Sequence, residues 1–572
     1  MRLPAITASL RHLQPHPHPT MAAIRPLPGK RLAPVWRPFL SAEALIALVS
    51  LYCLAALNGP FWAGVRAATD SVAVMLSLGV AVFALNAFLL GLLCWGRWAR
   101  PVLAVVLVAS ALAHWYMSRY AVVLDADMIR NVLHTDVAES RELITAGMLF
   151  HVLLFGLLPA IAVLLVRTHA RPWKRGLLLH SGFLAGMLLM TAIAIILSSQ
   201  GVFAMMRQHK ALRYQITPGN YLVGLVNVAK PSKREFSGPP AVIGADAKRP
   251  SAALQRRPRL FVLVVGETVR ADHWGLNGYA RQTTPELAAR KVINFPDVRA
   301  CGTSTEVSVP CMFSMQGREH YDQDAIRNHQ TLLDVVARAG VSVLWRDNQS
   351  GCKGVCARVP SHVMGSQDAS DLCAGGRCFD QILLAGLADR IKAMPGDGLI
   401  VLHMLGNHGP NYFERYPPAF ERWTPVCKSV ELSRCKQPEL VNAYDNAILY
   451  SDSVLGSLID LLKAQTSHDT AMLYVSDHGE SLGEYGLYLH GAPFSIAPDQ
   501  QLAVPMVLWL SPGFEADAGI NDACLRDFAL RRASHDNLFS TVLGVFDVQT
   551  SVYRNERDLL ASCRGTTQAS AQ

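Results

Sequence analysis

The sequence predicts a membrane-bound protein in two parts: an N-terminal domain of five transmembrane helices, and an α/β domain with a central, mostly parallel sheet flanked by helices. Its 572 residues exceed the usual size of one compact domain, and 51% of them are hydrophobic. Long apolar stretches occur before residue 200, whereas short β-branched runs alternate with helical segments after residue 259. This change of pattern separates a membrane part from a water-soluble part.

Five apolar stretches in the first part are long enough, or nearly so, to cross a hydrocarbon core of about 30 Å. They are Ala42 to Trp62, Ser71 to Trp95, Pro101 to Met117, Gly147 to Val166 and Leu177 to Ser198. Residues 1–40 hold no apolar core of the length that a signal peptide needs, and Met21 is an alternative start. We therefore expect an N-terminal extension at 1–40, a transmembrane domain at 41–199, bridging helices and a linker at 200–258, and the α/β domain at 259–572.

Arg and Lys predict which side of the membrane each part occupies. The N-terminal segment and the loops 96–100 and 167–175 are rich in these residues, whereas the alternate connections are not. By the positive-inside rule the N-terminus is cytoplasmic, and five crossings place everything after about residue 200 outside the cytoplasm. The first 199 residues hold 16 Lys and Arg against 7 Asp and Glu, which accounts for the whole net charge of +9. A soluble part without net charge argues against nucleic-acid binding.

Cysteine spacing supports this topology. Of 12 cysteines only Cys53 and Cys94 fall in the expected spans. The other ten occur at close spacings, which indicates disulfides in an oxidising compartment. Zinc ribbons are the competing interpretation, but no C-x-x-C pair occurs. The spacings favour the pairs Cys301 with Cys311, Cys352 with Cys356, Cys373 with Cys378 and Cys427 with Cys435, and leave Cys524 with Cys563 open.

Polar side chains follow four apolar runs of the expected sheet. The residues at these four run ends are Glu267 after Leu260 to Val265; Arg346, Asp347 and Asn348 after Val341 to Trp345; His403, Asn407 and His408 after Leu399 to Leu402; and Asp477 and His478 after Met472 to Val475. The carboxyl ends of parallel strands meet at one edge of a sheet, which is where α/β folds place their sites. We therefore expect these side chains to gather there.

Several of these residues suit a divalent metal ion. A lone histidine is more often a satisfied structural residue, but a set of carboxylates and imidazoles on one edge favours a metal site. The candidate ligands are Glu267, Asp477, His478, His403, His408 and His490. A catalytic metal keeps one coordination position open, so a nucleophile is expected nearby.

The segment from Cys301 to Cys311 contains the candidate nucleophiles. A hydroxyl is a weak nucleophile unless a base or a metal ion activates it. Thr303, Ser304 and Thr305 all offer one, and spacing does not choose among them. The structural alternative is an ordinary helix N-cap, where Ser and Thr are common.

A set of motifs across the chain resembles one enzyme family. These motifs are Val265-Gly266-Glu267-Thr268, Arg270-Ala271-Asp272-His273, the Cys301 to Cys311 segment, Trp345 to Asn348 followed by Lys353-Gly354, Gly406-Asn407-His408-Gly409-Pro410, Asn442-Ala443-Tyr444-Asp445-Asn446, and Ser476 to Gly483. They resemble the lipid A phosphoethanolamine transferases, the family of polymyxin and colistin resistance enzymes within the alkaline phosphatase superfamily. The acidic loop from Val123 to Glu142 resembles the periplasmic loop that lies over the active site in that family.

The resemblance implies a fold and a set of roles. It implies an alkaline phosphatase or sulfatase-like periplasmic domain, held at the bacterial inner membrane and dependent on Zn²⁺. The roles it implies are zinc ligation by Glu267, Thr305, Asp477 and His478, nucleophilic attack by Thr305, binding of a second zinc or of phosphate by His403, His408 and His490, and substrate binding by Asn348 and Lys353. It also implies phosphatidylethanolamine as donor and lipid A as acceptor, and we expect a monomer.

Other functions remain as alternatives. The same transfer to a lipopolysaccharide core, a glucan or a protein is the nearest one. A sulfatase is disfavoured because its Cys-x-Pro-x-Arg pattern is absent. Gly479 to Gly483 fits the G-x-S-x-G elbow of serine hydrolases around Ser481, with His535 downstream. A non-catalytic sensor or scaffold is disfavoured because the acidic, imidazole and hydroxyl set is complete.

Overall fold

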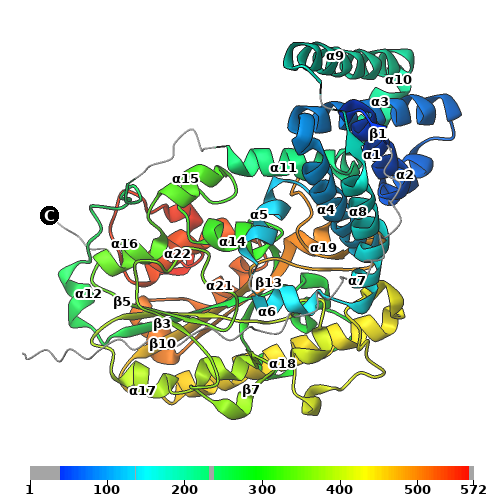
Figure 1. Cartoon of the computed structure of the whole chain (residues 1–572). Coiled ribbons are helices and arrows are strands. Elements are labelled where there is room, and N and C mark those ends of the chain that lie inside the picture. The colour runs from blue at the N-terminus through cyan, green and yellow to red at the C-terminus, as the bar shows by residue number, and fades with distance from the viewer. Residues whose placement is uncertain (1–38, 136, 170, 231–237, 566–572) are drawn as a thin grey trace, which may run out of the picture.

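The computed structural model describes residues 39–135, 137–169, 171–230 and 238–565. The expected extension at 1–40, with Met21, lies almost wholly outside the described residues, as does part of the linker. Figure 1 shows a helical domain on one side and a larger α/β domain on the other. The helices of the first domain and its connections are α1 (Ala42–Ala56), α2 (Gly59–Ala68), α3 (Val72–Leu93), α4 (Ala99–Tyr120), α5 (Ala126–His134), α6 (Val137–Glu142), α7 (Ala146–Val152), α8 (Leu158–Leu165), α9 (Trp173–Leu197), α10 (Ser199–Gln208) and α11 (Gly219–Ala229).

Four continuous helical stretches in the described residues are long and apolar enough to cross a membrane, or up to five when one bent pair is counted as a span. The four are Val72–Leu93, Gly96–Tyr120, Ala146–Leu165, in which α7 continues into α8, and Trp173–Leu197. The bent pair is α1 with α2, which meet at 61°. The predicted span from Ala42 to Trp62 is therefore not one straight helix but bends between Ala56 and Gly59. The buried Asn58 ends α1: its amide nitrogen donates to the carbonyls of Cys53 and Thr217, 2.8 and 2.7 Å away, and its oxygen accepts from the backbone N–H of Thr217. Those bonds tie the break to the bridging segment.

The α/β domain is built on an eight-stranded sheet. Its strand order is β14-β4-β13-β10-β3-β9-β5-β6. The strands are β3 (Arg259–Gly266), β4 (Ile293–Arg299), β5 (Ser342–Asp347), β6 (Ser361–Val363), β9 (Gly398–His403), β10 (Asp469–Ser476), β13 (Ala503–Leu510) and β14 (Ala533–Ser534). Only β13 runs antiparallel to its neighbours, β10 and β4. The expectation of a mostly parallel sheet is confirmed.

Helices cover both faces of this sheet, with α18 on one face and α14, α16 and α22 on the other (Figure 1). Alternate residues of β3 enter different cores: Phe261, Leu263 and Val265 pack in one, and Val262 and Val264 in the other. A strand buried on both faces explains the uninterrupted apolar run in the sequence. The helices of this domain are α12 (Ser251–Gln255), α13 (Pro285–Ala289), α14 (Thr305–Met312), α15 (Gln323–Asn328), α16 (Leu332–Arg338), α17 (Leu387–Lys392), α18 (Gln437–Lys463), α19 (Asp499–Leu502), α20 (Pro512–Ala518), α21 (Asp522–Phe528) and α22 (Leu538–Val545).

Short two-stranded pairs and disulfides complete the structure. The pairs are β1 (Phe39–Leu40) with β2 (Arg167–Thr168), β7 (Cys373–Ala374) with β8 (Arg377–Cys378), and β11 (Ser481–Leu482) with β12 (Tyr488–Leu489). The disulfides join Cys301 to Cys311, Cys352 to Cys356, Cys373 to Cys378, Cys427 to Cys435 and Cys524 to Cys563. The pair that the spacing left open is thus also bonded, while Cys53 and Cys94 are free and buried.

Candidate metal centre and nucleophile

Two neighbouring parallel strands deliver three metal-competent side chains to one point. Strands β3 and β10 pair in register up to Gly266 and Ser476, so the next residues, Glu267 and Asp477, leave the sheet side by side. With His478 they offer ligand atoms that all lie within 4.8 Å of one another, and all three side chains are fully buried. The sheet edge that the sequence indicated is therefore the place where these groups meet.

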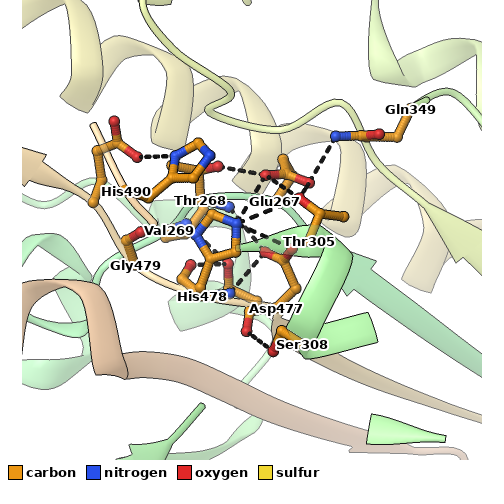
Figure 2. A network of polar contacts seen from close by, with 12 residues as sticks. Glu267, Thr268, Val269, Thr305, Ser308, Gln349, Asp477, His478, Gly479 and His490 are labelled. Atoms are coloured by element: carbon orange, nitrogen blue, oxygen red, sulfur yellow. Dashed lines mark hydrogen bonds and ion pairs between the residues drawn. The ribbon is translucent and has the colours of Figure 1, made fainter. Parts of the chain in front are cut away.

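The hydroxyl of Thr305 points into this cluster, as Figure 2 shows. Its Oγ1 lies 3.1 and 3.3 Å from the two carboxylate oxygens of Glu267, and 3.4 Å from Nε2 of His478. Thr305 is the first residue of α14, and Ser304 is its N-cap. The Thr303 hydroxyl instead donates to the carbonyl of Ala492. Of the two threonine hydroxyls in this segment, the one that reaches the cluster is that of Thr305.

The electrostatics of the cluster suit a bound cation. Burial opposes protonation of His478, but the charges of Asp477 and Glu267 outweigh it and raise its pKa to about 10. Burial and the neighbouring Glu267 carboxylate raise the pKa of Asp477 to about 6. For Glu267, burial opposes ionisation, yet the hydrogen bond and charge of His478 hold its pKa well below the usual range. Two buried carboxylates thus share one imidazole, and a divalent cation would balance them.

One carboxylate oxygen of Asp477 supports the same conclusion. Oδ2 of Asp477 is buried, makes no hydrogen bond among the described residues, and contacts Nε2 of His478 at 3.3 Å. A buried carboxylate oxygen that accepts no hydrogen bond is costly unless something else occupies its lone pairs. Together with the carboxylate and imidazole donors, which suit zinc, this oxygen indicates that the residues present fit a metal ion.

Two of the three other predicted histidines extend the cluster in a row from His478. The ring of His490 is 4.4 Å from that of His478, and the ring of His408 is 5.7 Å from that of His490. Nδ1 of His490 lies 2.9 Å from a carboxylate oxygen of Glu480, which fixes the orientation of the ring. His403 is fully buried, and its Nδ1 lies 3.0 Å from Asp347. Their role in binding a second metal or phosphate stays a prediction.

The segment after β5 differs from the expectation in detail. The side-chain amide of Asn348 donates to the carbonyl of Cys378 and to Asp380, both at 2.9 Å. It therefore ties the end of β5 to the segment that follows β8. Lys353 donates to the hydroxyl of Ser350 at 2.8 Å. The residue that reaches the cluster is Gln349, whose Nε2 donates to Glu267 at 2.9 Å (Figure 2). The position of Gln349, two residues after the end of β5, was the available signal in the sequence. Substrate binding by Asn348 and Lys353 stays a prediction.

The serine hydrolase alternative is wrong. The hydroxyl of Ser481 is buried and accepts a hydrogen bond from Gln501 at 2.9 Å. His535 accepts from the backbone N–H of Cys301 with one ring nitrogen, and its other ring nitrogen lies 2.9 Å from the carbonyl of Ser476. The hydrogen bonds that the structure gives Ser481 and His535 are thus to other groups, and the serine that lies near His535 is Ser308, 3.4 Å from its Nδ1. The Ser481–His535 pair that such a hydrolase would require is not formed.

The loop between the helices α4 and α7 packs next to Thr305. His134, at the end of α5, lies with Nδ1 2.7 Å from a carboxylate oxygen of Glu306, the residue after Thr305. Arg327 pairs with the same oxygen. At the end of α6, the carboxylate of Glu142 is 2.7 Å from Arg415. The described residues of the loop from Val123 to Glu142 therefore lie beside Thr305 and the candidate metal cluster, as the sequence resemblance of this loop implied.

Fold and site together define a membrane-anchored enzyme of the alkaline phosphatase and sulfatase class, and the family described as "Sulfatase" matches residues 259–548. The family described as "Phosphoethanolamine transferase EptA/EptB" matches residues 82–232. The chain belongs to the phosphoethanolamine transferase family: it is 38% identical over 542 residues to phosphoethanolamine transferase EptA of Escherichia coli K12, covering 92% of this chain and 98% of that protein.

Two further relatives agree with this assignment. Phosphatidylethanolamine transferase Mcr-1 of Escherichia coli is 36% identical over 530 residues, covering 90% of this chain and 96% of that one. The solved structure of the integral membrane lipooligosaccharide phosphoethanolamine transferase A of Neisseria meningitidis matches with a TM-score of 0.88 and 38% identity, covering 92% of this chain and 99% of that chain. The helical domain thus lies in the inner membrane and the α/β domain in the periplasm.

Proposed function

We propose that this protein transfers phosphoethanolamine from phosphatidylethanolamine to a phosphate of lipid A through a covalent intermediate on Thr305. The observation that carries the proposal is the position of the Thr305 hydroxyl, 3.1 Å from Glu267 inside the Glu267, Asp477 and His478 cluster. The names of the relatives support the substrates: one is a phosphatidylethanolamine transferase and another a Kdo(2)-lipid A phosphoethanolamine 7''-transferase. An added ammonium group would lower the negative charge of lipid A and so weaken its attraction for polymyxin and other cationic peptides.

The cluster would hold Zn²⁺ through Glu267, Asp477, His478 and the Thr305 oxygen. Carboxylate and imidazole ligands with one place for a reacting group match catalytic zinc. When bound, the ion supplies the positive charge that makes the threonine alkoxide accessible near neutral pH. Gln349 holds the Glu267 carboxylate through its amide, 2.9 Å away.

The residues of the chain account for the two steps. In the first step the Thr305 oxygen attacks phosphorus, the bond from phosphorus to the glycerol oxygen breaks, and diacylglycerol leaves with a proton. In the second step a phosphate oxygen of lipid A attacks the same phosphorus and frees Thr305. In this proposal His490, whose ring adjoins that of His478, and His408, whose ring adjoins that of His490, give and take these protons. Lys353 offsets phosphate charge.

Peptide mass spectrometry tests the intermediate. Purified protein in detergent is incubated with phosphatidylethanolamine, and the peptide with Thr305 should gain the mass of phosphoethanolamine. The Thr305→Val variant should lose this mass and about 10³-fold or more of the transfer rate, because no covalent route remains. Modification of another residue in the wild-type protein would refute the assignment. Mass analysis of lipid A from expressing cells identifies the acceptor, and modified core sugar, glucan or protein instead of lipid A would contradict that part.

A further inference from the structure

A cavity lies between the loop from Val123 to Glu142 and the α/β domain. Its volume is about 750 Å³, which is in the range of ligand sites in proteins. Three parts of the chain line it: the end of α6, the β7–β8 hairpin, and the segment that follows β9. The residues on which the argument depends are Arg141, Glu142, Arg377, Phe413, Arg415 and Tyr416.

Two arginines hold a carboxylate at this cavity. Glu142 forms ion pairs with both Arg377 and Arg415, and the second of these is 2.7 Å long. Nη2 of Arg377 is buried and has no hydrogen-bond partner among the described residues. Guanidinium groups bind phosphate and carboxylate oxygens with the same planar geometry. The Glu142 carboxylate therefore occupies a position that suits a phosphate.

The rest of the lining fits a phosphorylated sugar. Three arginines face two glutamates, Glu142 and Glu414, so the lining carries a surplus of positive charge. The rings of Phe379, Phe413 and Tyr416 supply flat apolar surface, against which the C–H face of a sugar ring can pack. The headgroup of phosphatidylethanolamine is a zwitterion without net charge, and it has no need of this arginine pair.

The cavity also lies between the membrane and the metal centre. Glu142 precedes by four residues Ala146, where the next candidate span begins, so the rim of the cavity is near the bilayer surface. On the inner side, Nε of Arg415 donates to the carbonyl of His408 at 2.6 Å. The ring of His408 in turn adjoins that of His490 beside the cluster. A headgroup in the cavity would remain attached to its lipid and still approach Thr305.

We propose that this cavity binds the phosphorylated sugar headgroup of the lipid acceptor, with Arg377 and Arg415 on a phosphate that competes with the carboxylate of Glu142. The proposal rests on the proposed function, because it names where the second substrate of that reaction binds.

Two variants that break the same ion pair test the proposal, because it gives them effects of opposite sign. Arg377→Ala removes a ligand of the phosphate and should raise KM for lipid A about 10-fold, as the loss of one charged hydrogen-bonding group does. Glu142→Gln removes the competing charge and should lower KM for lipid A several-fold. Lys392→Ala removes one positive charge from an exposed pair with Asp389, away from the cavity, and is the matched control with unchanged KM.

The alternative is that Glu142 and Arg377 merely clamp the loop to the α/β domain. Both variants would then change KM in the same direction, and that result would overturn the proposal. The donor half-reaction, measured as modification of Thr305 by phosphatidylethanolamine, distinguishes the two substrates: if Arg377→Ala slows it as much as the transfer to lipid A, the cavity serves the donor and the proposal is wrong. If wild-type protein forms no Thr305 intermediate, the proposed function fails. Direct binding of lipid A to the same variants in detergent then still tests whether the cavity binds the acceptor: weaker binding in Arg377→Ala and tighter binding in Glu142→Gln would support it, and equal changes in both would overturn it.

Discussion

The hydrogen bond from Gln349 to Glu267 gives a quantitative prediction for metal affinity. Changing Gln349 to Ala removes the amide that donates to the Glu267 carboxylate at 2.9 Å. A hydrogen bond to a charged group is worth about 1.5–3 kcal/mol, and about 1.4 kcal/mol corresponds to a factor of ten. We therefore expect the zinc affinity to fall about 10- to 100-fold, in line with the usual cost of losing a residue that orients a metal ligand.

Competition with a chromogenic chelator measures this affinity without reference to activity. Purified full-length protein in detergent is titrated with zinc for the wild type, Gln349→Ala and the control Gln465→Ala, whose amide donates to the Leu461 carbonyl on α18. The control should bind zinc as the wild type does. Wild-type affinity in Gln349→Ala, together with a slower transfer reaction, would show that Gln349 acts on substrate and would refute the reasoning.

Three further predictions concern catalysis and stability. Ser481→Ala should leave transfer within a few-fold of wild type while chelation abolishes it; survival of activity after metal removal would contradict the metal mechanism. Burial raises the pKa of Asp452 to about 7, so between about pH 4 and 7 the folded state holds a proton that the unfolded state has lost. The free energy of unfolding should therefore fall as the pH rises from about 4 to 7, by at most about 4 kcal/mol. In Asp452→Asn the unfolding temperature should depend less on pH than in the wild type. An unchanged pH dependence of the unfolding temperature would exclude Asp452 as its cause. Replacing Cys524 and Cys563 by Ser opens a loop with a sequence separation of 39 and should cost about 4 kcal/mol in the chain-entropy picture, seen as a lower unfolding temperature; an unchanged temperature would contradict it.

The sequence predicted the architecture well because two of its patterns have simple physical causes. A span must be apolar over its whole length, and a strand buried on both faces must be a short apolar run. The break after α1 depends on Asn58, which pairs with Thr217 far along the chain. A hydropathy pattern cannot report a contact between such distant residues, so the bend within the first predicted span was not predicted.

For the candidate site, the strand ends identified the residues but not the direction of every side chain. Glu267 and Asp477 could be predicted to meet because β3 and β10 pair in parallel. Three hydroxyls in one segment could not be distinguished until the start of α14 placed Thr305 at the cluster. Asn348 and Gln349 are adjacent, and only the turn after β5 decides which of them reaches Glu267.

The contact between His134 and Glu306 joins the two halves of the protein at the reaction centre. All the residues of the metal cluster belong to the α/β domain, so that domain, cut from its anchor, would keep the whole ligand set. It would lose the imidazole that holds Glu306, next to Thr305, from the side of the membrane. The transmembrane domain thus also contributes a residue beside the candidate active site. The isolated periplasmic domain should therefore bind metal as the full-length protein does, yet transfer phosphoethanolamine between lipids more slowly.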